Sequence, residues 1–100
     1  MASKSASKTR AGRVLIRSYG SGVHYGTLVS KKDTEVVLSN ARRVWYWTGA
    51  NTLHELSLHG VKSGSKISER VPEITVTGVL EVLPLTKEAE AALDALGWGK

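Results

Sequence analysis

The apolar positions of the chain fall in short, β-branched runs separated by turn-forming residues. The first run, residues 14–16, ends in the glycine-rich segment 18–22. A second run covers 24–30, and a third, 35–38, follows the polar loop 31–34. Segments of this length bounded by Gly, Ser, Asn and Asp are typical of antiparallel strands joined by hairpins. The first third of the chain is therefore predicted to form three strands.

A fourth strand is predicted over residues 42–47, after a turn at 39–41. Side chains alternate between the two faces of a strand. Strict alternation puts Arg43 and two tryptophans on one face, and Val44 with Tyr46 on the other. Residues 73–83 read as one bent strand or two short ones, because a glycine inside a strand marks a bulge or a corner.

Two helices are predicted from their capping residues. Thr52 and Glu55 form a capping box, and Gly60 is placed to end the first helix. Its leucines at 53, 56 and 58 are expected to face the barrel. Thr86 caps a second helix, residues 87–96, whose apolar face is formed by positions 89, 92, 93 and 96. Its acidic residues are expected to point outward: Glu88, Glu90 and Asp94.

These elements predict a mainly β (α+β) fold. We expect a five- to six-stranded SH3-like or Sm-like barrel, or a curled antiparallel sheet, with a short inserted helix and a C-terminal helix. Residues 13–100 form one domain, and residues 1–12 lack periodicity and read as a disordered basic arm. Short strands leave open edges and the last helix has an apolar face, so a homo-oligomer is expected.

The distribution of charged residues bears on the kind of ligand and says little about the fold. The chain carries a formal net charge of +5, and residues 1–13 hold four basic side chains and no acidic one. The body is therefore almost neutral, which suits a local pocket better than a long track for a polyanion. Within the body, residues 14–68 are basic and residues 69–100 are acidic.

The composition and the spacing of residues lead us to expect that several classes of function are absent. The chain has no cysteine, so disulfides and thiolate sites are absent. His54 and His59 are five residues apart, which does not place two ligands on one helix face, and no metal or other cofactor is expected. We find no ordered nucleophile motif and expect no enzymatic activity. No apolar run is long enough to span a bilayer, so a cytoplasmic protein without membrane contact is expected.

Two segments carry candidate binding chemistry. Arg42, Arg43, Trp45 and Trp47 combine guanidinium groups with aromatic rings, which suits phosphates and nucleobases, although the tryptophans can equally fill the core. The glycine-rich segment offers Tyr19, Ser21 and His24 to a phosphate, or serves only as a hairpin turn. Asn51 follows a glycine turn and can contact a base or ribose edge, or cap the helix.

Part of the chain resembles a known family. The motifs Gly22-Val23-His24-Tyr25-Gly26-Thr27-Leu28 and Ala41-Arg42-Arg43-Val44-Trp45-Tyr46-Trp47, with Gly49-Ala50-Asn51-Thr52-Leu53, are similar to a family of short tailed-bacteriophage proteins with no assigned role. The similarity extends over about residues 13–85. It implies a viral gene product acting in the cytoplasm of an infected bacterium.

A fainter resemblance is to Sm-like RNA-binding barrels. Gly26-Thr27-Leu28, Asp33, Leu38 and Asn40 follow the spacing of their first motif. Where those proteins carry an Arg-Gly pair, this chain has Thr77-Gly78-Val79. The chain is also similar, in size and character only, to small phage proteins that sequester nucleotide immune signals.

Three functions remain open from the sequence. The first is non-catalytic binding of a phosphate-bearing ligand, a nucleotide or cyclic nucleotide, with sequestration of a host immune signal as its use. The second is a nucleic-acid-binding barrel for RNA or single-stranded DNA, aided by the basic arm. The third is a structural or inhibitory protein–protein interaction module of a phage, with aromatic anchors on residues 45–47.

Overall fold

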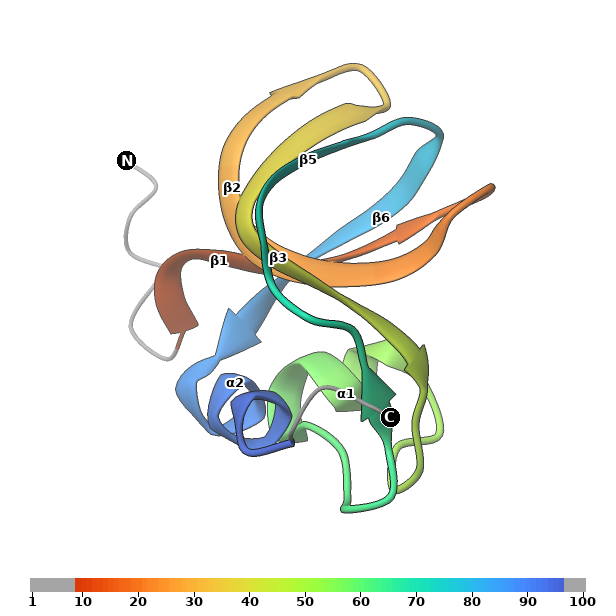
Figure 1. Ribbon diagram of the computed structural model, residues 1–100, viewed down its shortest axis with the longest axis vertical. Helices are drawn as coiled ribbons and strands as arrows, with labels where there is room; N and C mark the ends of the chain where they lie inside the picture. The colour runs from red at the N-terminus through yellow and green to blue at the C-terminus, as the bar shows by residue number, and fades with distance from the viewer. Residues whose placement is uncertain (1–8, 97–100) are drawn as a thin grey trace.

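The computed structural model describes residues 9–96, with side-chain environments from Gly12 onward. Within this range the chain forms six strands and two helices (Figure 1). The elements, in chain order, are β1 (Thr9–Ser18), β2 (Gly22–Lys32), β3 (Glu35–Tyr46), α1 (Leu53–His59), β4 (Lys66–Ile67), β5 (Val71–Val76), β6 (Val79–Thr86) and α2 (Lys87–Asp94).

The strands form one antiparallel sheet in the order β4-β3-β2-β1-β6, and β5 pairs with the first half of β3. Long β2 and β3 bend strongly, so the sheet curls and brings β5 and β6 opposite β2 (Figure 1). The two helices lie together below the curl. The mainly β fold with a short inserted helix and a C-terminal helix is confirmed.

The curled sheet separates two hydrophobic clusters. One lies inside the curl and is built from Val14, Ile16, Val36, Leu38, Ala41, Val76 and Val79. The other lies between the outer face of the sheet and the helices, and is built from Leu15, Val23, Tyr25, Val44, Leu56, Ile67, Leu85, Ala89 and Leu93. Because neighbours along β1 contribute to opposite clusters, this strand is covered on both faces.

Strand boundaries differ from the sequence-based expectation at three places. β1 begins at Thr9, inside the predicted arm, where a register shift and the positive φ of Gly12 (75°) accommodate a bulge. Residues 1–8 of that arm lie outside the described residues. Segment 39–41 is not a turn, because Asn40 takes a positive φ (48°) that bends β3 without ending it. A further short strand, β4, forms where no strand was predicted, and in it fully buried Ile67 pairs with Val44.

The predicted face assignment of the aromatic strand is wrong beyond Val44. The β3–β4 register shifts between Val44 and Tyr46, so the strand bulges at Trp45. The extra residue turns Trp47 to the helix side of the sheet, where it packs against the same cluster as Val44. Trp45 and Tyr46 are both exposed, at 55% and 51% of their surface.

The helix starts follow the predicted capping residues. Thr52 Oγ1 accepts a hydrogen bond from Glu55 N at 3.1 Å, and Thr86 Oγ1 accepts one from Ala89 N at 3.0 Å. Leu56 is buried as expected, whereas Leu58 is half exposed. Residues 73–83 divide into two strands around Gly78, whose φ is positive (68°).

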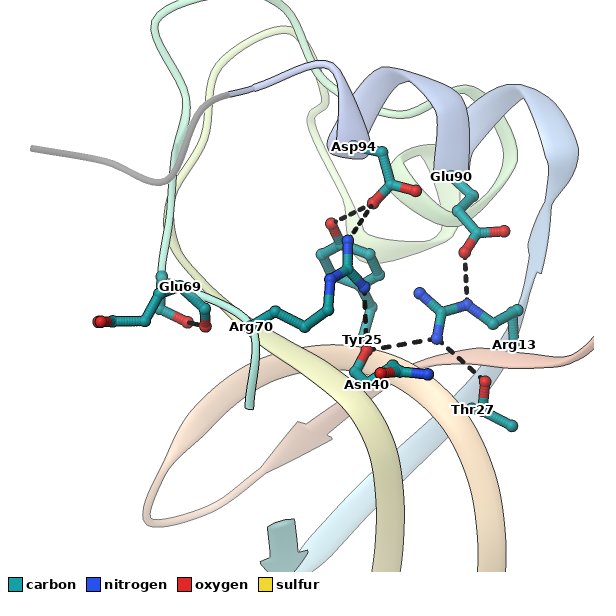
Figure 2. A network of polar contacts seen from close by, with 9 residues as sticks. Arg13, Tyr25, Thr27, Asn40, Glu69, Arg70, Glu90 and Asp94 are labelled. Atoms are coloured by element: carbon teal, nitrogen blue, oxygen red, sulfur yellow. Dashed lines mark hydrogen bonds and ion pairs between the residues drawn. The ribbon is translucent and has the colours of Figure 1, made fainter. Parts of the chain in front are cut away.

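A polar network fastens α2 to the sheet (Figure 2). Glu90, expected to point outward, is buried and forms an ion pair with the buried Arg13 Nε. On the next turn of the helix, Asp94 Oδ1 accepts a hydrogen bond from the Tyr25 hydroxyl at 2.8 Å and lies 3.5 Å from Arg70 Nη2. Glu90 can be buried because the guanidinium of Arg13 on β1 neutralises its charge.

Candidate functional site

Three of the predicted site residues meet at a recess beside β3. We call it the His24 recess; it has a volume of about 200 Å³ and is lined by His24, Ala41, Arg42, Arg43, Ser68, Val71 and Ile74. β2 supplies the histidine, β3 the arginines, and β5 the apolar wall. None of these lining residues is acidic, so the charge of the recess is positive.

His24 is held opposite Arg43 by the pairing of β2 with β3. Arg43 Nε donates to His24 Nε2 at 3.4 Å. Burial, and to a lesser degree the charge of Arg43, lowers the pKa of His24 from 6.5 to about 4. The imidazole is therefore neutral near pH 7, and because Nε2 accepts, its proton lies on Nδ1.

Two buried nitrogens have no hydrogen-bond partner among the described residues, and they lie on opposite faces of the sheet. They are His24 Nδ1, on the face of Arg43, and Arg42 Nε, on the helix side, where Arg42 pairs with Tyr25. Both are donors, and a buried donor without a partner carries an energetic cost that usually has a functional or structural reason. Together with the exposed guanidinium of Arg43, the Nδ1–H group of His24 gives the recess a positive field that favours an oxyanion.

The rim of the recess is held by backbone contacts to Ser68. Ser68 N donates to Arg43 O at 2.9 Å, and Ser68 Oγ accepts from Arg43 N at 2.8 Å. The same hydroxyl donates to Glu69 O at 2.9 Å. These bonds fix the backbone of Arg43 and leave its side chain exposed.

An aromatic side chain stands beside the recess without lining it. Trp45 follows Arg43 by two residues on β3, which corresponds to about 7 Å along a strand. More than half of its surface is exposed. Arg43 and Trp45 are thus both exposed, two residues apart on β3.

Two other predicted residues belong to a separate cavity. We call it the Trp47 cleft; it has a volume of about 450 Å³ and is lined by Arg17, Val23, Trp47, Asn51, Thr52, Leu53, His54 and Glu81. It lies on the helix side of the sheet, where α1 begins. The predicted site is thus divided by the sheet, because the bulge at Trp45 separates Trp47 from Arg43.

The glycine-rich segment closes a hairpin, and none of residues 18–22 lines either cavity. Ser18 Oγ accepts a hydrogen bond from Ser21 N at 2.9 Å and lies 2.7 Å from Ser21 Oγ. Tyr19 N donates to Gly78 O at 2.9 Å, while its side chain is 87% exposed. Tyr19 and Ser21 therefore join neither the His24 recess nor the Trp47 cleft.

Between residues 9 and 96, no group of three His, Asp or Glu side chains is arranged to hold a metal ion. In the same part of the chain, neither helix has the length and apolar character needed to cross a bilayer.

Residues 11–93 match the family model described as "Domain of unknown function (DUF6948)". The chain belongs to this family. No curated protein and no solved structure matches the chain. The matched DUF6948 segment contains all residues that line the His24 recess and the Trp47 cleft.

Sequence reasoning missed the residues that complete each cavity in this DUF6948 chain. Ser68 and Val71 reach the His24 recess from segments far from His24 in sequence. Arg17 and Glu81 reach the Trp47 cleft from β1 and β6, which pair with each other. Only the order of the strands brings these residues to the cavities, and no local pattern marks them.

Proposed function

We propose that the chain is a non-catalytic binding protein for a phosphate-bearing ligand, a nucleotide or cyclic nucleotide, with the phosphate at the His24 recess. The observation that carries the proposal is the cluster of His24, Arg42 and Arg43 around a recess without an acidic lining residue. His24 holds a buried donor without a partner among the described residues. A phosphate oxygen is an acceptor of the right charge for such a surface.

Each group has a distinct part in this binding. The Arg43 guanidinium is exposed and contacts the oxyanion directly. The covered Nδ1–H group of His24 acts from behind it, because an oriented dipole in a low-dielectric wall stabilises a nearby charge without touching it. Trp45 offers its exposed ring to the base of the same ligand.

The volume of the recess sets a limit on what enters it. At about 200 Å³ it is smaller than a typical small-molecule site. It suits a phosphate group, whereas the sugar and base stay outside, over the surface near Trp45. We therefore expect the ligand to be held mainly through its phosphate group.

The biological context of this binding function is part of the same proposal. The resemblance to short tailed-bacteriophage proteins supports a role in the cytoplasm of an infected bacterium. There, a binder without catalysis would act by holding a nucleotide immune signal away from its receptor.

The proposal is tested by thermal denaturation with a panel of ligands. We expect a nucleoside monophosphate, a cyclic nucleotide or inorganic sulfate to raise the melting temperature, because a ligand that binds only the folded state stabilises it. Arg43→Gln should abolish the shift. Lys32→Gln removes one exposed charge at the far end of β2 and should retain it.

A second experiment identifies the natural ligand. The protein is purified under native conditions from infected cells and denatured, and the released small molecules are examined by mass spectrometry. A phosphate-bearing compound is expected. If no nucleotide is released and none raises the melting temperature, the proposal is wrong.

A protein–protein interface is the second candidate, because Trp45 and Tyr46 are adjacent and exposed. Adjacent exposed aromatic side chains are common anchors of protein interfaces. Self-association also stays a prediction, and sedimentation of the wild-type chain against a Trp45→Ala, Tyr46→Ala variant checks it. Binding to nucleic acid is distinguished by its steep loss of affinity with salt.

A further inference from the structure

The Trp47 cleft is a second cavity with a chemistry of its own. Val23 and His24 are neighbours on β2 and line different cavities, so the sheet stands between the cleft and the His24 recess. At about 450 Å³, the cleft lies in the size range of small-molecule sites. One mononucleotide cannot occupy both places.

One wall of the cleft is a fixed aromatic ring. Trp47 is half-buried and packs against the helix-side cluster, which holds the indole in place while part of it lines the cleft. Val23 and Leu53 add apolar surface beside it. A flat ring stacked on an indole is the occupant that such a wall favours.

The loop that carries Trp47 and Asn51 is pinned in place. Ser65 is buried, and its hydroxyl accepts from Thr48 N at 3.0 Å and donates to Lys62 O at 2.8 Å. Lys62 N donates to Thr48 O at 3.0 Å. A site built on a rigid loop loses little conformational entropy on binding.

The start of α1 is fixed in the same way. Asn51 N donates to Glu55 Oε1 at 3.0 Å, and the exposed Asn51 lines the cleft. Arg17 and Glu81 line it as well, and Arg17 Nη1 and Glu81 Oε1 are 4.0 Å apart. The rim therefore offers a cation, an anion and an amide, so it presents both donors and acceptors without net charge.

The polar groups of the Trp47 cleft differ from those of the His24 recess, which favour an oxyanion. A neutral rim with donors and acceptors above an indole wall matches a flat heteroaromatic ring that also carries both. We propose that the Trp47 cleft binds the base of a nucleoside, stacked on Trp47 and hydrogen-bonded at its edge by Asn51 and the Arg17–Glu81 pair. This site needs no phosphate and is separate from the one proposed above.

The test uses nucleosides, which lack phosphate, and the fluorescence of Trp47. Trp45 and Trp98 are replaced by Phe so that Trp47 is the sole indole of the full chain; Trp98 lies outside the described residues. Adenosine, guanosine, cytidine and uridine are titrated in turn. At least one is expected to quench the fluorescence saturably, with a dissociation constant of about 1 mM or tighter.

Two substitutions test the rim. Asn51→Ala is expected to weaken binding about tenfold, as for the loss of one or two hydrogen bonds, and Glu81→Gln to weaken it severalfold, because a neutral amide replaces the charged acceptor. Glu73→Gln, an exposed acid on β5, is the matched control and should leave binding unchanged. The melting temperature of each variant is measured first, and only variants that melt as the parent does are compared.

The outcomes are distinct. The inference is overturned if none of the four nucleosides quenches saturably, or if both rim variants bind as tightly as the parent. It is also overturned if inorganic sulfate competes with the nucleoside, because then the two share a site. Failure of sulfate to stabilise the protein would contradict the function proposed for the recess and leave the cleft result standing.

Discussion

Arg13 and Glu90 form a buried ion pair that joins β1 to α2 across 77 positions of the sequence. Their side chains are only 6% and 7% exposed. Arg13 Nη1 also donates to Thr27 Oγ1 at 3.0 Å and to Asn40 O at 3.3 Å. The guanidinium therefore ties the helix to β2 and to the bend of β3 at the same time (Figure 2).

We expect Glu90→Ala to lower the free energy of unfolding by about 3 kcal/mol or more, because it leaves the Arg13 charge buried without its carboxylate. The double variant Arg13→Met, Glu90→Leu should recover most of the loss, since both charges are then removed. Chemical denaturation of the three proteins measures this. Equal stability of Glu90→Ala and the wild type would show that the ion pair does not hold α2.

Stability should depend on pH through His24. Burial lowers its pKa from 6.5 to about 4 in the folded chain, so the unfolded chain binds the proton at a higher pH. The free energy of unfolding therefore falls as pH drops from 6.5 towards 4, by about 3 kcal/mol at most. Denaturation curves at a series of pH values report this slope.

The contribution of His24 is isolated by substitution. In His24→Gln the slope between pH 6.5 and 4 should become shallower, because the group that takes up the proton on unfolding is gone. His54→Gln, at an exposed position of α1, should keep the slope of the wild type. An unchanged slope in His24→Gln would mean that His24 does not stay neutral in the folded chain.

Gly26 marks a close approach of β2 to β3. A Cβ atom there would lie 2.9 Å from Ser39 O and 3.1 Å from the Cα and Cβ of Ala41, which lines the His24 recess. We expect Gly26→Ala to cost about 1–3 kcal/mol of unfolding free energy. Gly20→Ala, where no atom lies within 4 Å of the new Cβ, is the control. Similar melting temperatures for the two variants would contradict the close approach.

Deletion of residues 1–8 distinguishes binding of a phosphate in the His24 recess from binding of nucleic acid along the basic N-terminal segment. The deletion removes two lysines and leaves β1, which begins at Thr9, intact. If the phosphate is bound at the His24 recess, the shift in melting temperature caused by a nucleotide is retained. Loss of that shift would instead indicate that the basic segment supplies the phosphate contacts, as a nucleic-acid binder requires.

Local signals in the sequence were enough to predict most elements. Thr52 and Thr86 begin their helices because capping depends on residues only three positions apart. The hairpins were predicted from turn-forming residues, which also act over only a few positions of the chain. The fold class followed from the order of these elements.

Three of the predictions that failed concern features that depend on residues distant in the sequence. Burial of Glu90 requires Arg13, which the helix pattern of residues 87–96 does not contain. The face of Trp47 depends on a bulge that arises only when β4 pairs with β3. The recess depends on β2, β3 and β5 meeting, so the predicted site residues were divided between two cavities and a hairpin.

The central claim is that an oxyanion binds at the His24 recess. It is tested most directly by nitrogen-15 NMR of the histidine side chains during a titration with inorganic sulfate, whose charge does not change near neutral pH. We expect the Nδ1 resonance of His24 to shift saturably, and the pKa of His24 to rise from about 4, because a bound anion stabilises the imidazolium. A His24 signal and pKa that do not respond to sulfate would contradict the claim.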